Sequence, residues 1–179
     1  MIKKNKNLII ILFIIAHAVF LVMNFIQPLI VTGVSVKMFD LMMFKGYDLA
    51  YATTFVNEIS QQGKNVYLFV QVPLDFIYPL LVSAFFYLFF LDQTRNKKIA
   101  SLGFVSMVFD YMENIFVIVI LTTVNLTDTI VGIASIATII KGGFYVINYG
   151  LVVYLLIRCR YRMGCPFKNE IKKDKNNAK

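Results

Sequence analysis

Four ionisable residues lie within hydrophobic stretches of this chain: Asp75, Asp110, Glu113 and Lys141. A charged side chain at the centre of a bilayer costs about 2.5–3.5 kcal/mol on insertion scales, so such residues usually pair or mark a functional pathway. Lys141 can neutralise one carboxylate, but three are present. The other two must be protonated, bind a cation or face water, because a bare buried carboxylate carries a large desolvation cost.

The spacing of nearby polar residues extends this set. Asp110, Glu113 and Asn114 have i, i+3 and i+4 spacing, so they share one face of a helix. A second polar stripe, at i, i+3, i+7 and i+10, consists of Thr138, Lys141, Tyr145 and Asn148. The two stripes and Asp75 are predicted to meet at a similar depth, which favours one shared polar site.

Asp75 lies between two prolines, Pro73 and Pro79, with Tyr78 three residues further on. Each proline leaves a backbone carbonyl without its usual donor, so kinks and free acceptors are expected beside Asp75.

Two kinds of chemistry suit these groups. Paired carboxylates with separated pKa values can act as acid and base, and oxygen ligands from Asp75, Asp110, Glu113 and Asn114 would suit a hard cation. Their spacing is not a metal signature, so no metal or cofactor is expected. The alternative is structural, because interhelical hydrogen bonds also hold membrane bundles together. The single histidine, His17, is expected to be such a helix contact.

The elements that must position these residues are long apolar runs. Of the 179 residues, 59% are hydrophobic, and the mean hydropathy is +0.71. Runs over residues 8–31, 67–91, 99–121 and 129–157 each exceed the ~20 residues that a helix needs to cross a bilayer. The predicted fold is all-α, a polytopic four-helix membrane bundle over residues 1–158, followed by a basic tail, 159–179, that is expected to be disordered.

The positive charges set the predicted topology. Lysines precede the first run, and the second connection contains Arg95, Lys97 and Lys98. The tail is also basic. By the positive-inside rule both termini are cytoplasmic, and the basic excess contacts anionic lipid head groups rather than nucleic acid, for which no motif is present. The first run is too long for a cleaved signal. Cys159 and Cys165 are expected to be inert thiols in the tail.

The connection over residues 32–66 is the only long one and is predicted to face outward. Asp48 is predicted to cap a helix over residues 49–62 that Gly63 stops. Its apolar face is predicted to hold Leu49, Ala52, Thr53, Val56 and Ile59, and residues 36–44 are expected to lie at the membrane interface. The loop would either cap the outer mouth of the bundle or rest on the membrane surface.

Two patterns resemble an uncharacterised family of small bacterial four-helix membrane proteins. One joins Phe44-Lys45-Gly46-Tyr47-Asp48 to residues 62–67, and the other joins Asp75 and Tyr78-Pro79 to residues 110–114. The resemblance implies the architecture and a bacterial plasma membrane. Because that family has no established activity, it does not indicate what the protein does. A weaker similarity links Gln71-Val72-Pro73 to the four-helix sterol isomerase and sigma-2 receptor superfamily, but the chain has no tryptophan and lacks that superfamily's catalytic residues.

Three functions remain open from the sequence. The leading hypothesis is a pocket open toward the outer face that binds, and in one version transforms, a small or lipid-derived molecule. The second is a proton- or cation-coupled carrier that works as a homodimer, and the third is a structural subunit. The candidate site residues for ligand binding or proton transfer are Asp75, Asp110, Glu113, Lys141, Tyr78, Asn114, Tyr145 and Asn148.

Overall fold

The computed structural model describes residues 2–161, with side chains from 6 to 158. Four of its helical segments are long and apolar enough to cross a membrane: Lys6–Val31, Gln61–Thr94, Lys97–Thr122 and Asp128–Arg158. Residues 2–161 contain no strand. The predicted all-α fold with four candidate spans is confirmed, whereas the tail from residue 162 on, with Cys165, lies outside the described residues.

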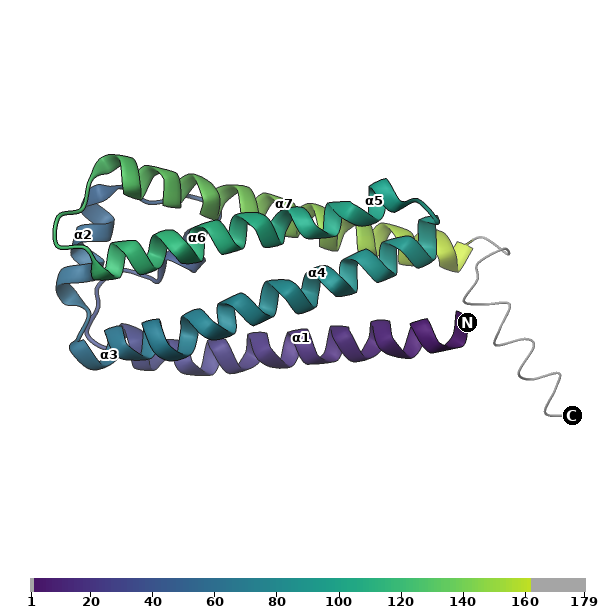
Figure 1. Cartoon of the computed structure of the whole chain (residues 1–179), viewed down its shortest axis with the longest axis horizontal. Helices are drawn as coiled ribbons and strands as arrows, with labels where there is room; N and C mark the ends of the chain where they lie inside the picture. Colours follow the sequence, from purple (N-terminus) through teal and green to yellow (C-terminus); the bar gives the residue numbers. More distant parts are fainter. Residues whose placement is uncertain (1, 162–179) are drawn as a thin grey trace, which may run out of the picture.

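The long helices pack in chain order. They are α1 (Ile2–Val31), α4 (Val72–Thr94), α6 (Val105–Thr122) and α7 (Asp128–Tyr161). The main contacts join α1 to α4, α4 to α6 and α6 to α7, so α1 and α7 occupy opposite edges of the bundle (Figure 1). The start of α1 and the end of α7 lie at the same end (Figure 1). We call this the terminal end and the opposite one the loop end.

Large apolar side chains cover the outside of the bundle. Phe25 is 80% exposed, Phe69 76% and Ile14 60%. So many exposed apolar groups along four helices would make a large hydrophobic patch in water, whereas lipid solvates them without cost. The distribution matches a multi-pass membrane protein.

The second candidate span begins earlier than predicted, at Gln61 instead of residue 67, which leaves a loop of residues 32–60. It starts with α3 (Gln61–Val66), continues as a π-helical turn, η2 (Tyr67–Gln71), and becomes α4. The prediction that Gly63 stops a helix is wrong. Ser60 is the N-cap of α3 and its hydroxyl accepts from Gly63 N at 3.0 Å. A Cβ at Gly63 would lie 2.6 Å from the Ile30 carbonyl oxygen, so glycine permits this close approach.

The third candidate span also begins early, at Lys97 rather than residue 99. A short helix, α5 (Lys97–Ser101), and a 3-10 turn, η3 (Leu102–Phe104), precede α6. Asn96 caps α5 by accepting from Lys98 N at 2.9 Å.

The loop over residues 32–60 folds onto the bundle. It contains a 3-10 turn, η1 (Phe39–Met42), and α2 (Leu49–Glu58). The predicted cap is confirmed, because Asp48 accepts from Tyr51 N at 2.8 Å. The expectation that residues 36–44 lie at the membrane interface is wrong for Met38 and Phe39, which are 2% and 0% exposed.

The buried face of α2 matches the predicted one in part. Ala52 and Ile59 are buried as predicted, and Leu49 and Val56 are half-buried, whereas Thr53 is exposed and Phe55, which was not predicted, is buried. The reason is aromatic packing, since the Phe55 ring lies 4.8 Å from that of Phe39 and 6.1 Å from that of Tyr67, measured between ring centroids.

Candidate functional site

Lys141 of α7 lies at the centre of a buried cluster of charges. Its Nζ is 3.2 Å from Asp40 Oδ1 and 3.2 Å from Asp110 Oδ1, and it also forms an ion pair with Glu113 Oε2. A lysine ammonium has three N–H donors, so these three carboxyl groups occupy all of them. The predicted meeting of Asp110 and Glu113 with Lys141 is therefore present. We call Lys141, Asp40, Asp75, Asp110 and Glu113 the acidic cluster.

Asp40 is the member that the sequence analysis missed. It lies in η1, 101 positions from Lys141 in the chain, and its Oδ2 is also 3.5 Å from the Tyr67 hydroxyl. The buried ring of Phe39 anchors η1 in the bundle and so brings the next residue, Asp40, to α7. The available signal was an acidic residue in an otherwise apolar stretch, between Phe39 and Leu41.

Glu113 of α6 is fully buried behind Lys141. Its Oε1 accepts a hydrogen bond of 2.6 Å from Thr138 Oγ1, while Oε2 faces Lys141. The hydroxyl of Thr138 also lies 3.0 Å from the Ala134 carbonyl oxygen, and its single proton can serve only one acceptor at a time. Glu113 thus holds α6 to α7 and orients Lys141.

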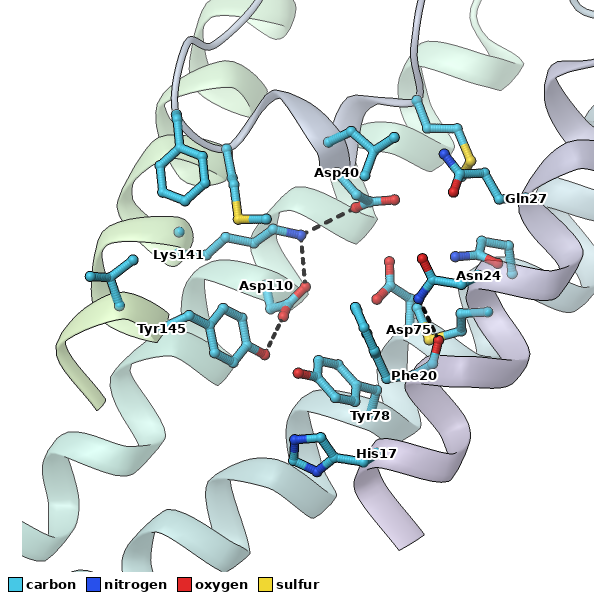
Figure 2. A pocket seen from close by; sticks show the side chains of 18 of the residues that line it. His17, Phe20, Asn24, Gln27, Asp40, Asp75, Tyr78, Asp110, Lys141 and Tyr145 are labelled. Carbon is cyan, nitrogen blue, oxygen red and sulfur yellow. Dashed lines mark hydrogen bonds and ion pairs between the residues drawn. The ribbon is translucent and has the colours of Figure 1, made fainter. Parts of the chain in front are cut away.

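Asp110, one turn before Glu113 on α6, is 1% exposed. Its Oδ1 pairs with Lys141, and its Oδ2 accepts from the Tyr145 hydroxyl at 2.7 Å (Figure 2). Both carboxylate oxygens have donors from α7, so Asp110 is held in one orientation.

Asp75 of α4 differs from the other acids. Its side chain is buried, at 4% exposure for the residue, and within residues 6–158 its carboxylate forms neither a hydrogen bond nor an ion pair. The acidic cluster therefore contains four carboxyl groups and one ammonium. Lys141 pairs with three of these carboxyl groups, and Asp75 is the one that it does not reach.

A second acceptor without a donor lies one helical turn before Asp75. The side-chain oxygen of Gln71 is buried and has no hydrogen-bond partner in the described part of the chain. Gln71 is 4% exposed. The sequence analysis did not include Gln71 among the candidate residues, although its i, i+4 relation to Asp75 places both on one face.

A cavity of about 620 Å³ lies beside the acidic cluster, between α1 and α7 at the loop end of the bundle. Figure 2 shows Lys141 and Asp40 on one side, Asn24 and Gln27 of α1 on the other, and Asp75 between them. Most of the lining is apolar or aromatic. The charged and amide residues on its wall are Asn24, Gln27, Asp40, Gln71, Asp75, Asp110 and Lys141.

Contacts from α1 and α7 close the cavity toward the terminal end. The Tyr149 hydroxyl is 3.3 Å from His17 Nε2, and His17 Nδ1 is 2.8 Å from the Phe13 carbonyl oxygen. His17 is therefore a helix contact, as predicted, and it also lines the cavity. Tyr78 packs between Phe20 and Tyr145, at 5.6 and 6.1 Å between ring centroids.

The loop covers the cavity at the loop end. Met43 packs directly on Gly142, where an added Cβ would lie 2.8 Å from Met43 Cβ. Tyr47 N donates to Ser135 Oγ of α7 at 2.8 Å. Burial raises the pKa of the Tyr47 phenol above its ordinary value, and nearby Glu113 and Asp40 add to this, so Tyr47 remains neutral in the loop. Of the two predicted roles for the loop, the cap is the one that these contacts support.

The eight candidate residues separate into two groups. Those that line the cavity are Asp75, Tyr78, Asp110, Lys141 and Tyr145. The other three, Glu113, Asn114 and Asn148, do not line the cavity. Asn148 Nδ2 lies 3.4 Å from Ser106 Oγ and 3.5 Å from the Leu102 carbonyl oxygen, which places it at the contact between α6 and α7.

Within the described side chains, no three His, Cys, Asp or Glu residues are placed to hold a metal ion. The acidic cluster is instead spread around a lysine. Comparison of the chain with protein-family models, with curated protein sequences and with solved structures finds no match. The functional argument consequently depends on the site's own chemistry.

Proposed function

We propose that this protein is an integral membrane protein that binds a small or lipid-derived molecule in the cavity between α1 and α7. The observation that carries the proposal is a cavity of about 620 Å³ with mostly apolar walls and convergent charged groups at one side. Ligand sites of membrane and soluble proteins share this combination of volume, apolar lining and a few polar groups. Buried ionisable groups in a membrane bundle also favour a functional role over a purely structural one.

The proposed orientation places both termini in the cytoplasm of a bacterial cell, with the loop end facing outward. Its support is the charge distribution, because Arg95 connects α4 to α5 and Lys97 and Lys98 begin the third span, all at the terminal end. Positive residues are retained on the cytoplasmic side. The cavity would then lie in the outer half of the membrane, beneath the loop.

In this proposal each charged residue has a distinct part. Asp75 and Asp110 line the cavity and accept hydrogen bonds from the ligand, and Lys141 supplies the counter-charge of Asp110. Glu113 and Thr138 hold Lys141 in place from behind. An enzyme that transforms the bound molecule is one version of this function, with Asp75 as the carboxyl group free to exchange a proton.

Ligand retention after gentle extraction tests the proposal. Asp110→Asn keeps the size of the side chain and removes the charge that faces both the cavity and Lys141. We expect it to insert normally and to lose a co-extracted molecule that native mass spectrometry detects on the wild-type protein. Asp92→Asn at the terminal end of α4, whose carboxylate contacts Gln93, is the matched control. Equal retention by both variants would contradict the proposal.

A second candidate is a proton- or cation-coupled carrier that acts as a homodimer. The observation that favours it is Asp75, a carboxyl group on the cavity wall without a partner among the described side chains. Intramembrane acids in this situation often carry protons in transporters. This candidate predicts pH-dependent flux in proteoliposomes that Asp75→Asn abolishes, and an absence of flux under any proton gradient would exclude it.

A further inference from the structure

Two buried polar stripes face each other along the contact between α6 and α7. The helices run in opposite directions, so the stripes pair at three levels: Thr138 with Glu113, Lys141 and Tyr145 with Asp110, and Asn148 with Ser106. From Thr138 to Asn148 the three levels extend over about 15 Å of helix. The series therefore leads from the acidic cluster toward the terminal end of the bundle.

The hydrogen bonds at the three levels differ in length. At the first two levels, the bonds from Thr138 and Tyr145 to carboxylates are 2.6 and 2.7 Å long. At the third level, Asn148 Nδ2 lies 3.4 Å from Ser106 Oγ and 3.5 Å from the Leu102 carbonyl oxygen, which is long for a hydrogen bond. The amide oxygen of Asn148 has no hydrogen-bond partner within residues 6–158. The third level is therefore incompletely satisfied.

A hydroxyl group without a hydrogen-bond partner in the described part of the chain lies nearby on α4. It belongs to Ser83, which is fully buried. The turn of α4 that carries Ser83 packs on Gly103, because an added Cβ at Gly103 would lie 3.3 Å from the Ser83 carbonyl oxygen. The carbonyl oxygen of Gly103 lies 3.4 Å from Ser106 Oγ. We call Ser83, Ser106 and Asn148, where α4, α6 and α7 meet, the serine–asparagine cluster.

This cluster has the properties of a site for internal water. All three of its residues are 0% exposed, and a buried polar group left without a partner costs about 1–3 kcal/mol. Buried water in proteins typically forms about three hydrogen bonds to polar groups that are otherwise unsatisfied. Here a water molecule can donate to the amide oxygen of Asn148 and accept from a serine hydroxyl.

The backbone beside the cluster is irregular. The 3-10 turn η3 interrupts the third span at Leu102–Phe104, and Leu102 is 38% exposed. Non-helical backbone at membrane depth is tolerated where it is buried in protein or lines water. Leu102 is separated by about 8 Å of helix from Lys97, where the third span begins. The distance from the terminal end to Asn148 is therefore short.

We propose that water binds at the serine–asparagine cluster, enters from the terminal end beside η3, and gives Asp110 a route for proton exchange with that side of the membrane. Ser106 lies one helical turn from Asp110, so water at its hydroxyl can pass a proton toward the carboxyl group. Each oxygen on the route passes on one proton as it receives another, so only a proton is transferred. The inference does not depend on a ligand in the cavity.

Ag⁺ is the probe for this water, because it is close to a water molecule in size and replaces the proton of a thiol that contacts water. The test uses the full-length protein in lipid nanodiscs and chloride-free buffer, with Cys159→Ser and Cys165→Ser to remove the native thiols. Ser106→Cys reports on the cluster. Val108→Cys is the matched control, since Val108 lies at a similar depth on α6 but is 51% exposed on the outside of the bundle. Mass spectrometry follows the uptake of Ag⁺ with time.

We expect Ser106→Cys to react about ten-fold faster than Val108→Cys, or more, because the thiolate is the reactive form and a thiol in apolar surroundings resists ionisation. Adding Asn148→Leu, or the milder Ser83→Ala, should slow the reaction of Ser106→Cys, as each removes a group that holds water. Adding Val146→Trp, which fills the cavity, should leave the rate unchanged. The unfolding temperature of each variant confirms that it is folded.

Three results would overturn the inference. Equal rates for Ser106→Cys and Val108→Cys would show that water does not reach the cluster. A reaction that Val146→Trp slows would show that water arrives from the cavity. A rate that neither Asn148→Leu nor Ser83→Ala changes would show that these side chains do not hold the water. The proposed function is tested separately, by the co-extracted molecule, and would stand in all three cases.

Discussion

The side chain of Asn114 on α6 donates a hydrogen bond of 2.8 Å to the backbone carbonyl of Asp75 on α4. In a regular helix that carbonyl would accept from the N–H of residue 79, but Pro79 has no N–H. Asn114 therefore supplies the donor that Pro79 removes. The hydroxyl of Tyr111, on the same helix, donates to the next carbonyl, that of Phe76, at 2.9 Å. These two bonds fix the part of α4 that presents Asp75 to the cavity.

Asn114→Leu should destabilise the protein, because the Asp75 carbonyl then lacks a donor in a buried position. The expected loss is about 1–3 kcal/mol of unfolding free energy, measured by denaturation in detergent micelles. Pro79→Ala should rescue it, since residue 79 then has an N–H for the same carbonyl. In a double-mutant cycle the two substitutions should be clearly non-additive. Additive effects would show that Asn114 stabilises the bundle in another way.

Lys141→Met should be far more disruptive than loss of an exposed lysine. It leaves Asp40, Asp110 and Glu113 without their shared cation, and removing one partner of a buried ion pair costs about 3–5 kcal/mol. Lys45→Met, at an exposed position of the loop, is the control and should change stability little. The unfolding temperatures of the two variants in the same detergent provide the comparison. Similar values for both would argue against a charged cluster around Lys141.

Gly46→Ala should loosen the loop from α7. Gly46 has φ +69°, and an added Cβ would lie 2.6 Å from Ser135 Oγ, the atom that accepts from Tyr47 N. Gly33 has a similar φ of +81° but nothing within 4 Å of its Cβ position, so Gly33→Ala isolates the backbone strain of about 1–2 kcal/mol. Limited proteolysis of the loop should accelerate more for Gly46→Ala. Equal rates would mean that the contact with Ser135 does not hold the loop.

The start of the loop should respond to acid through Glu58. Its carboxylate accepts from Ser35 N and Ser35 Oγ, both at 2.6 Å, and these bonds lower the pKa of Glu58 below its ordinary value of 4.5. Because the pKa of Glu58 is lower in the folded protein than in the unfolded chain, ionised Glu58 stabilises the fold. This stabilisation is present above pH 4.5 and is lost as the pH falls through the pKa that Glu58 has in the folded protein. Protection of the Ser35 amide from hydrogen exchange should decline accordingly, after correction for the intrinsic rate. Glu58→Gln should show no such decline between pH 6 and pH 3.

The sequence was sufficient to predict which faces of the long helices turn inward. Helical spacing placed Asp110, Glu113 and Asn114 on one side, and all three are buried. It did not indicate their separate partners. Glu113 contacts α7, whereas Asn114 contacts α4, and this division depends on how α6 is rotated between its two neighbours. Periodicity carries no information about that rotation.

Asp40 shows a different limit of prediction. The residues around it are apolar in a way that suits either the membrane interface or the interior of the bundle. Which of the two holds is decided by contacts distant in sequence, such as the packing of Met43 on Gly142 and the ion pair of Asp40 with Lys141. A local pattern cannot distinguish them, and the position of Asp40 could not be deduced.

The most direct test of the central claim is to fill the cavity without altering its charges. Val146 lines the cavity and is 57% exposed, whereas Val153, also on α7, is 55% exposed and lies outside it. Both can accept a larger side chain without disturbing the packed core. Native mass spectrometry of gently extracted wild-type protein, Val146→Trp and Val153→Trp should reveal a bound molecule on the wild type and on Val153→Trp, and its loss from Val146→Trp. Equal occupancy of the two variants, or a wild-type protein that carries no such molecule, would contradict the claim.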